Sequence, residues 1–318
     1  MSTREFTDEE IEDQVRGLES LQGGSLAAAA LIGCGPRAIP FLRSFLLTGR
    51  PRGIYQPRQL AVETLAQLAA KDVLLEYLGK PSQIRDAVVR MGEDAVRSTA
   101  ARELGRWQTE DVFWGLTAAG TDHLLPGIVE ALGKFRRPET LPYLLWALGD
   151  GICRSYAEEA IRNMGEAARP ALLEAALARI PSSEEENASS LQRRRWVLRI
   201  LSDWQVPRED WNKLEALLDE KDPDIVITAA RIALQDASEP EKWRAIRRTI
   251  EMLPAANSFL QTEARTALAE NFHFAQEQIE DEIARRMKAD RKHQSLDVVL
   301  RLLVNLRNQV VETGSTRR

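Results

Sequence analysis

The chain has 318 residues, of which 44% are hydrophobic and 29% charged, and its formal net charge at pH 7 is −5. This acidic balance disfavours nucleic acid as the main partner, because nucleic-acid-binding proteins usually carry a basic excess, although a local basic face is compatible with it. Two cysteines outside any CxxC pair and only three histidines argue against a zinc site and favour a reducing, cytoplasmic setting. A polar amino-terminus predicts no signal peptide, and the lack of 18 consecutive apolar residues predicts no membrane span.

The first predicted element is an amino-terminal capping helix within residues 1–24. Thr7 and Glu10 have the spacing of a capping box, in which each side chain satisfies the other residue's backbone N–H. Ile11, Val15 and Leu18 recur on one face of the helix that follows, so this face is expected to cover the end of the core.

From residue 25 onward, a small residue followed by Leu or Ile returns about every 34 residues, which is a period typical of repeat arrays. The pairs are Ala30-Leu31, Thr64-Leu65, Ala131-Leu132, Ala160-Ile161, Ala233-Leu234 and Ala267-Leu268. One repeat cannot bury its apolar face alone, so neighbouring repeats must stack. We therefore predict an all-α fold, an α-solenoid of about nine stacked antiparallel helix pairs and no strand.

Glycine and proline mark the expected turns between these helices. Gly35, Gly92 and Gly165 each precede an apolar stretch and are interpreted as residues that end a helix. Pro138, Pro207 and Pro240 fall at one offset from their repeat position, where proline can open a helix but cannot lie inside one. Inner and outer helices should alternate along the chain. Counting forward from Gly35 and backward from Gly165 assigns opposite faces to the helices between residues 92 and 120, so either one helix is irregular there or the pattern splits one helix wrongly.

The predicted organisation has four further parts. Repeats occupy 25–180, and an exposed linker loop rich in Ser and Glu occupies 181–190. Further repeats with a carboxy-terminal cap occupy 191–311, and 312–318 is predicted to be a disordered tail.

Two stretches carry a family resemblance. Leu125–Phe135 followed by Pro138–Leu148 resembles a HEAT-like repeat of the subtype seen in phycobilisome lyases and many bacterial HEAT repeat scaffolds. Asp222–Arg231 resembles that family's turn into its inner helix, although Ile227 stands where the family usually has arginine. The resemblance spans about residues 25–270 and implies a superhelical fold. It implies no single function, because such arrays serve many tasks.

Arginine and tryptophan point to a binding face. Arg154, Arg193–Arg194 and Arg231 recur near the starts of consecutive inner helices, and Trp196 and Arg199 follow in the same helix as Arg193. These six residues are predicted to line the concave face, because Trp and Arg dominate the binding energy of interfaces. The alternative is a solvated face whose arginines pair with the carboxylates of 184–186, Glu239 and Glu241.

No P-loop, GxSxG, HExxH or dinucleotide-binding motif occurs, so no catalytic, cofactor-binding or metal-binding residue is predicted. The leading hypothesis is a non-enzymatic scaffold that binds a protein or peptide on its concave face. One alternative is a DNA-binding protein similar to HEAT-like alkylpurine glycosylases, using Trp107 with Asp111, or Trp196 with Arg199 and Asp203. Another is a bilin lyase or chaperone, which the repeat subtype alone suggests.

Overall fold

The structure is a computed structural model that describes residues 6–20, 22–81, 84–121, 123–182, 185–289 and 297–315. It is all-α, as the sequence predicts, and it divides into two compact units, Met1–Ala167 and Ala168–Arg318. None of the helices within the described ranges is both long and apolar enough to cross a membrane.

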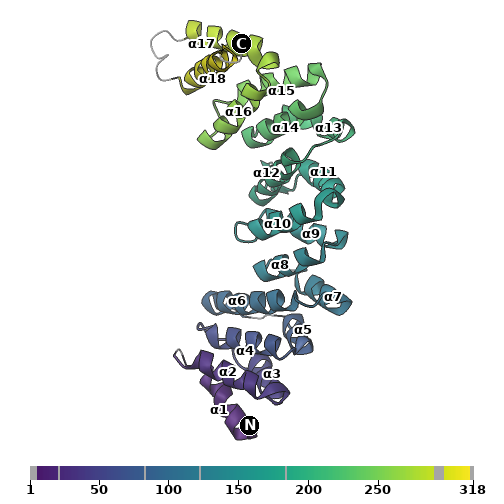
Figure 1. Cartoon of the computed structure of the whole chain (residues 1–318), viewed down its shortest axis with the longest axis vertical. Helices are drawn as coiled ribbons and strands as arrows, with labels where there is room; N and C mark the ends of the chain where they lie inside the picture. Colours follow the sequence, from purple (N-terminus) through teal and green to yellow (C-terminus); the bar gives the residue numbers. More distant parts are fainter. Residues whose placement is uncertain are drawn as a thin grey trace. The chain divides into compact units, whose positions relative to one another are not determined.

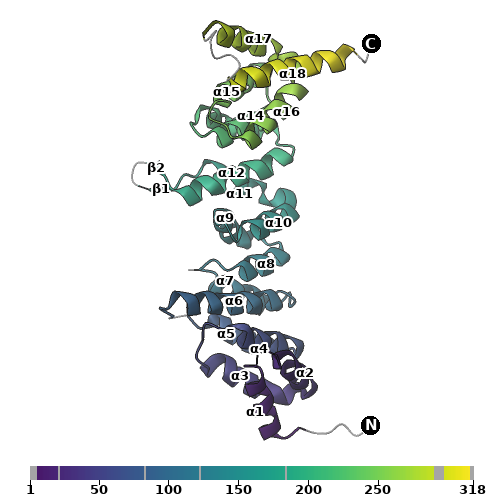
Figure 2. The same ribbon diagram turned by 90° about the vertical axis from the view of Figure 1, so that its left-hand side faces the viewer.

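In chain order, the elements up to the unit boundary are α1 (Asp8–Gly17), α2 (Gly24–Gly33), η1 (Gly35–Ala38), α3 (Ile39–Thr48), α4 (Gln56–Gln67), α5 (Lys71–Gly79), α6 (Ala87–Leu104), α7 (Glu110–Ala119), α8 (Pro126–Phe135), η2 (Pro138–Thr140), α9 (Leu141–Leu148), α10 (Arg154–Met164) and η3 (Gly165–Ala168). After it come α11 (Arg169–Leu177), β1 (Pro181–Ser182), β2 (Glu185–Glu186), α12 (Ala188–Asp203), α13 (Arg208–Leu214), η4 (Glu215–Asp219), α14 (Pro223–Asp236), α15 (Glu239–Met252), α16 (Ser258–Glu270), α17 (Phe272–Ala289) and α18 (Val298–Ser315). Figures 1 and 2 show these helices.

The helices of each unit stack in two rows. In the first unit, α2, α4, α6, α8 and α10 pack one on the next and form what we call the even row. The even row of the second unit consists of α12, α14, α16 and α18, and the odd-numbered helices form the other row of each unit. The predicted stacking of helix pairs is therefore present in both units, and the even row carries the more extensive helix-to-helix contacts.

The recurring apolar position lies in the core. Leu31, Leu65, Leu132, Ile161, Leu234 and Leu268 are all buried. Burying a leucine side chain contributes roughly 1.5–3 kcal/mol, and these residues repeat that contribution within each unit. The periodicity of the sequence therefore located the interior correctly.

Two of the three predicted glycine turns are confirmed. Gly35 and Gly165 adopt φ values of 64° and 61°, and each opens a short 3-10 helix before the next α-helix. A side chain is strained at such φ values, so glycine suits both turns. Pro138 begins η2, Pro207 caps α13 and Pro240 lies in the first turn of α15, as their shared offset predicts.

The third prediction is wrong, because Gly92 lies inside α6 and ends no helix. The true start of α6 is set by Asp86, whose side chain accepts a hydrogen bond of 2.9 Å from the Val89 N–H. A Cβ on Gly92 would lie 3.3 Å from Tyr55 Cβ, so this position of α6 packs closely against the residue before α4. With 87–104 as one helix, even and odd helices alternate regularly, and the conflict between residues 92 and 120 disappears.

The segment predicted as an exposed linker contains a small ribbon. Pro181 pairs with Glu186 and Ser182 with Glu185 in two antiparallel strands, labelled β1 and β2 in Figure 2, so the expectation of no strand fails here. Helix α12 begins at Ala188, with Asn187 as its N-cap, and the boundary between units falls earlier, after Ala167. At the other end, α18 continues to Ser315 and so includes residues 312–315 of the predicted tail, whereas 316–318 lie outside the described residues.

Candidate interaction surfaces

Arg194 is not the surface residue that the sequence predicts. Its side chain is 0% exposed, and its Nε donates a 2.7 Å hydrogen bond to the Ala176 carbonyl in the last turn of α11. Its Nη1 and Nη2 form ion pairs with Glu186 and Glu220. The last carbonyls of a helix lack partners within the helix, and a buried guanidinium needs carboxylates around it. Arg194 therefore joins α11, α12 and the β-ribbon and cannot contact a partner in this conformation.

Arg193 also faces inward in part. Its Nη2 donates a 2.6 Å hydrogen bond to the Ala178 carbonyl just beyond α11, and its burial lowers the pKa of the guanidinium. Neighbouring arginines of the predicted basic run thus serve the end of α11. Two of the six residues predicted to line the concave face, Arg193 and Arg194, are therefore bonded to the end of α11.

Trp196 and Arg199 do lie together. The Arg199 guanidinium lies 5.1 Å from the centre of the Trp196 ring and 4.9 Å from that of Phe259, and its Nη2 pairs with Asp224 at 3.0 Å. Phe259 belongs to α16 and is exposed, so this cluster spans three helices of the even row of the second unit. Arginine stacked on aromatic rings in this way is held rigidly.

Of the other two predicted residues, one lies on a helix of this cluster and one belongs to the first unit. Arg231 of α14 pairs with Glu263 of α16 at 2.8 Å. Arg154 is the half-buried first residue of α10 and belongs to the first unit, whereas the remaining five predicted residues belong to the second.

A ladder of ion pairs connects successive helices of the even rows. Arg58 of α4 binds Glu93 of α6 at 3.0 Å, and Arg102 of α6 binds Glu130 of α8 at 2.7 Å. Arg199–Asp224 and Arg231–Glu263 repeat the arrangement in the second unit. These arginines therefore fit the predicted alternative of an ion-paired face better than the predicted binding face. Most of their partners, however, are carboxylates of the next helix in the row and not the ones that the sequence predicts.

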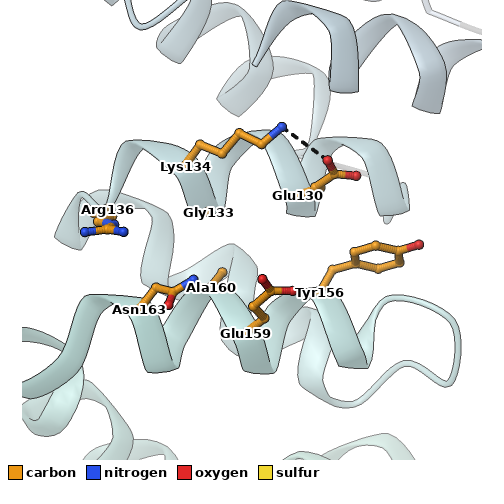
Figure 3. Close-up of a pocket in the computed structure, with 8 residues that line it drawn as sticks. All are labelled: Glu130, Gly133, Lys134, Arg136, Tyr156, Glu159, Ala160 and Asn163. Carbon is orange, nitrogen blue, oxygen red and sulfur yellow. Dashed lines mark hydrogen bonds and ion pairs between the residues drawn. The ribbon is translucent and has the colours of Figure 1, made fainter. Parts of the chain in front are cut away.

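The contact between α8 and α10 differs from the ion-paired contacts above, because it contains a groove. The groove has a volume of 490 Å³ and is lined by Glu130, Gly133, Lys134, Arg136, Tyr156, Glu159, Ala160 and Asn163. Figure 3 shows α8 and α10 as its two walls, with Arg136 toward one end and Tyr156 toward the other. A Cβ on Gly133 would lie 2.5 Å from Ala160 Cβ, so the two helices are in close contact where these residues meet.

Charges of both signs remain available in this groove. Lys134 Nζ lies 3.2 Å from Glu130 Oε1 within α8, and although burial raises the pKa of Glu130, hydrogen bonds from Arg102 and Lys134 bring it below its usual value. Across the groove, Arg136 and Glu159 are exposed, and neither forms an ion pair with any residue in the described part of the chain. No ion pair among the described residues therefore links α8 to α10, whereas Arg102 and Glu130 link α6 to α8.

A second groove lies between α14 and α16, in the other unit. It has a volume of 390 Å³ and includes Arg231 and Glu263, together with Gln235, Thr266 and Glu270. Of the six predicted residues, Arg231 is the one that lines it. Here the Arg231–Glu263 pair crosses the step, so fewer charged groups remain for a ligand.

The two cysteine thiols and Asp111 are each held in one protonation state at neutral pH. Burial raises the pKa of Cys153 to about 12, and burial also raises the pKa of Cys34, so neither thiol is a ready nucleophile at neutral pH. A hydrogen bond from Lys71 holds the pKa of Asp111 at about 2, and Trp107 packs against the core. Asp111 therefore carries no proton to donate at neutral pH. The described residues contain no group of His, Cys, Asp and Glu side chains that would hold a metal ion.

No protein-family model matches the chain, and a search of curated proteins found no match. The HEAT-like resemblance therefore stays a prediction based on the residues that carry it.

Proposed function

We propose that this protein is a non-enzymatic, HEAT-like interaction scaffold that binds a partner protein or peptide on the even row of its first unit, at the α8–α10 groove. The observation that carries the proposal is the groove itself. Arg136 and Glu159 form no ion pair there with any described residue, whereas Arg102 and Glu130 pair between the preceding helices, α6 and α8. Stacked helix pairs present extended surfaces suited to such binding. A cytoplasmic location belongs to the proposal, because free cysteines are typical of reducing compartments.

The chemistry of the groove supports a peptide as the ligand. Arg136 at one end suits a carboxylate, and Glu159 on the facing helix suits a cationic side chain. The Asn163 amide can both donate to and accept from a peptide backbone. Tyr156 offers a rigid amphipathic side chain of the type that is enriched at interfaces.

The DNA-binding alternative has less support. DNA affinity comes chiefly from cationic side chains that neutralise phosphates. The arginines of α12 already bind carbonyls and carboxylates, as do those of α4 and α6 in the ladder. These arginines are therefore not free to neutralise phosphates.

The test is capture of partners from the source cell by the tagged protein and by the charge-reversal variant Arg136→Glu/Glu159→Lys. Both positions are exposed, so the variant should fold, and it should lose the partners that the wild-type protein retains. Arg301→Glu/Glu277→Lys is the matched control, because it reverses the same two kinds of exposed charge in the second unit. Equal recovery of partners by both variants and the wild type contradicts the groove as the binding site. Salt-sensitive retention of DNA without protein would favour the alternative.

A further inference from the structure

An exposed apolar patch lies on the first unit, separate from the groove. Ile54 and Tyr55 precede α4, and Val88 and Met91 lie in the first turns of α6; they are 60%, 43%, 67% and 71% exposed. Single apolar residues on a surface are ordinary, whereas a contiguous group of them marks an interaction site.

Contacts at two glycines show that these two pairs of residues are neighbours. A Cβ on Gly92 would lie 3.3 Å from Tyr55 Cβ and 3.6 Å from the Gly53 carbonyl oxygen, and a Cβ on Gly53 would lie 3.8 Å from Val88 Cγ1. The loop before α4 therefore lies directly on the first turns of α6. The tight packing at Gly92 brings two short apolar pairs, far apart in the sequence, into one surface.

The charges around this patch are mainly positive. Arg50 and Arg52 precede Ile54 in the same loop, and Arg85 precedes the N-cap of α6; all three are exposed. Arg52 lies 3.5 Å from Glu19, while Arg50 and Arg85 form no ion pair within the described residues. Asp86, the N-cap of α6, accepts a hydrogen bond from the Val89 N–H and keeps its negative charge. Three arginines against the carboxylates of Glu19 and Asp86 leave the rim of the patch net cationic.

We propose that this patch is a second docking site and that it takes an acidic amphipathic segment of a partner protein. Apolar side chains of the segment would cover Ile54, Val88 and Met91, and its carboxylates would meet Arg50 and Arg85. Methionine suits such a surface because its flexible thioether adapts to different apolar partners. An anionic membrane fits less well, since basic clusters that bind lipid headgroups typically hold about 4–8 lysines and arginines. The proposal goes beyond the α8–α10 groove and does not depend on it.

The experiment is a selection of displayed random peptides on the full chain, followed by fluorescence titration of the enriched peptides. Enriched peptides should combine apolar residues with Asp or Glu. Val88→Asp/Met91→Asp should weaken their binding by about tenfold or more, as loss of central apolar contacts does. Arg50→Glu/Arg85→Glu should weaken it several-fold and reduce its dependence on salt.

The matched control is Ile152→Asp, which changes an aliphatic residue of the same unit that is 73% exposed and lies outside the patch. It should bind the peptides as the wild type does, and so should the groove variant Arg136→Glu/Glu159→Lys, which separates this proposal from the preceding one. The proposal is overturned if no peptide is enriched, if the enriched peptides are basic, or if they bind the Val88→Asp/Met91→Asp protein equally well. Sedimentation with phosphatidylserine vesicles in place of peptide binding would also overturn it. Unchanged circular dichroism melts confirm that the variants are folded.

Discussion

Arg58, Arg97 and Arg194 have the same role in different repeats. Each lies on an even-row helix and donates to carbonyls at the end of the preceding odd-row helix: Arg58 to Leu46 at 3.0 Å, Arg97 to Leu78 at 2.7 Å and Arg194 to Ala176 at 2.7 Å. The end of a helix has unpaired carbonyls and a partial negative charge, so a guanidinium stabilises it. These arginines join the two helices of a pair, and for Arg58 and Arg194 a carboxylate completes the site.

Replacing Arg194 by methionine tests this role. Arg194→Met keeps much of the apolar volume but leaves Glu186 and Glu220 without their buried partner. The free energy of unfolding should fall by roughly 3–5 kcal/mol, as it does when one partner of a buried ion pair is removed. Urea denaturation measures the change. Arg247→Met, at a side chain that is 69% exposed, is the control and should stay within about 0.5 kcal/mol. A loss of the same small size for Arg194→Met contradicts the role in holding α11 and α12 together.

Among the elements, α8 is packed unusually closely between its neighbours. A Cβ on Gly127 would lie 1.8 Å from the Ser98 carbonyl oxygen of α6, and a Cβ on Gly133 would lie 2.5 Å from Ala160 Cβ of α10. Ser98 Oγ also accepts a 3.0 Å hydrogen bond from the Gly127 N–H. The absence of side chains at these two positions lets α6, α8 and α10 approach one another, so glycine here is required by the packing of one helix on the next.

Gly127→Ala is therefore expected to destabilise the protein, although alanine favours helices more than glycine does. The new methyl group meets backbone, which cannot move aside without separating α6 from α8. The expected loss is about 1–3 kcal/mol in a urea melt, typical of overpacking. Gly33→Ala provides the comparison, because a Cβ there meets nothing within 4 Å. If both variants melt alike, the close approach of α6 and α8 is not a constraint on the sequence.

At the scale of the whole molecule, each unit has its own core cluster of buried residues. Leu132 is 1% exposed in a core cluster of the first unit, and Leu234 is 7% exposed in a core cluster of the second. Leu132→Ala and Leu234→Ala should each lower the free energy of unfolding by about 2–5 kcal/mol, the range for buried leucines. Because they belong to separate clusters, their effects should add to within about 0.5 kcal/mol in the double variant.

Urea melts of the two single variants and the double variant measure this. Leu26→Ala is the control, since Leu26 is 76% exposed although it also lies on an even-row helix. A loss below about 0.5 kcal/mol for either core variant, the range of surface substitutions, would show that the repeat register is wrong.

The sequence by itself determined the all-α class, the stacking of helix pairs and the buried positions. These depend on helical periodicity and on the backbone preferences of Gly35, Gly165 and the three aligned prolines, all of which act locally. The tertiary structure alone decided which polar residues are exposed and unpaired, and so available to bind a partner. Arg193, Arg194 and Arg195 are consecutive, yet Arg194 is buried while Arg195 stays 30% exposed beside Asp222, because each residue turns about 100° further around the helix toward different neighbours. The groove between α8 and α10 and the patch at Gly92 likewise arise from the approach of helices distant in sequence, which no local pattern records.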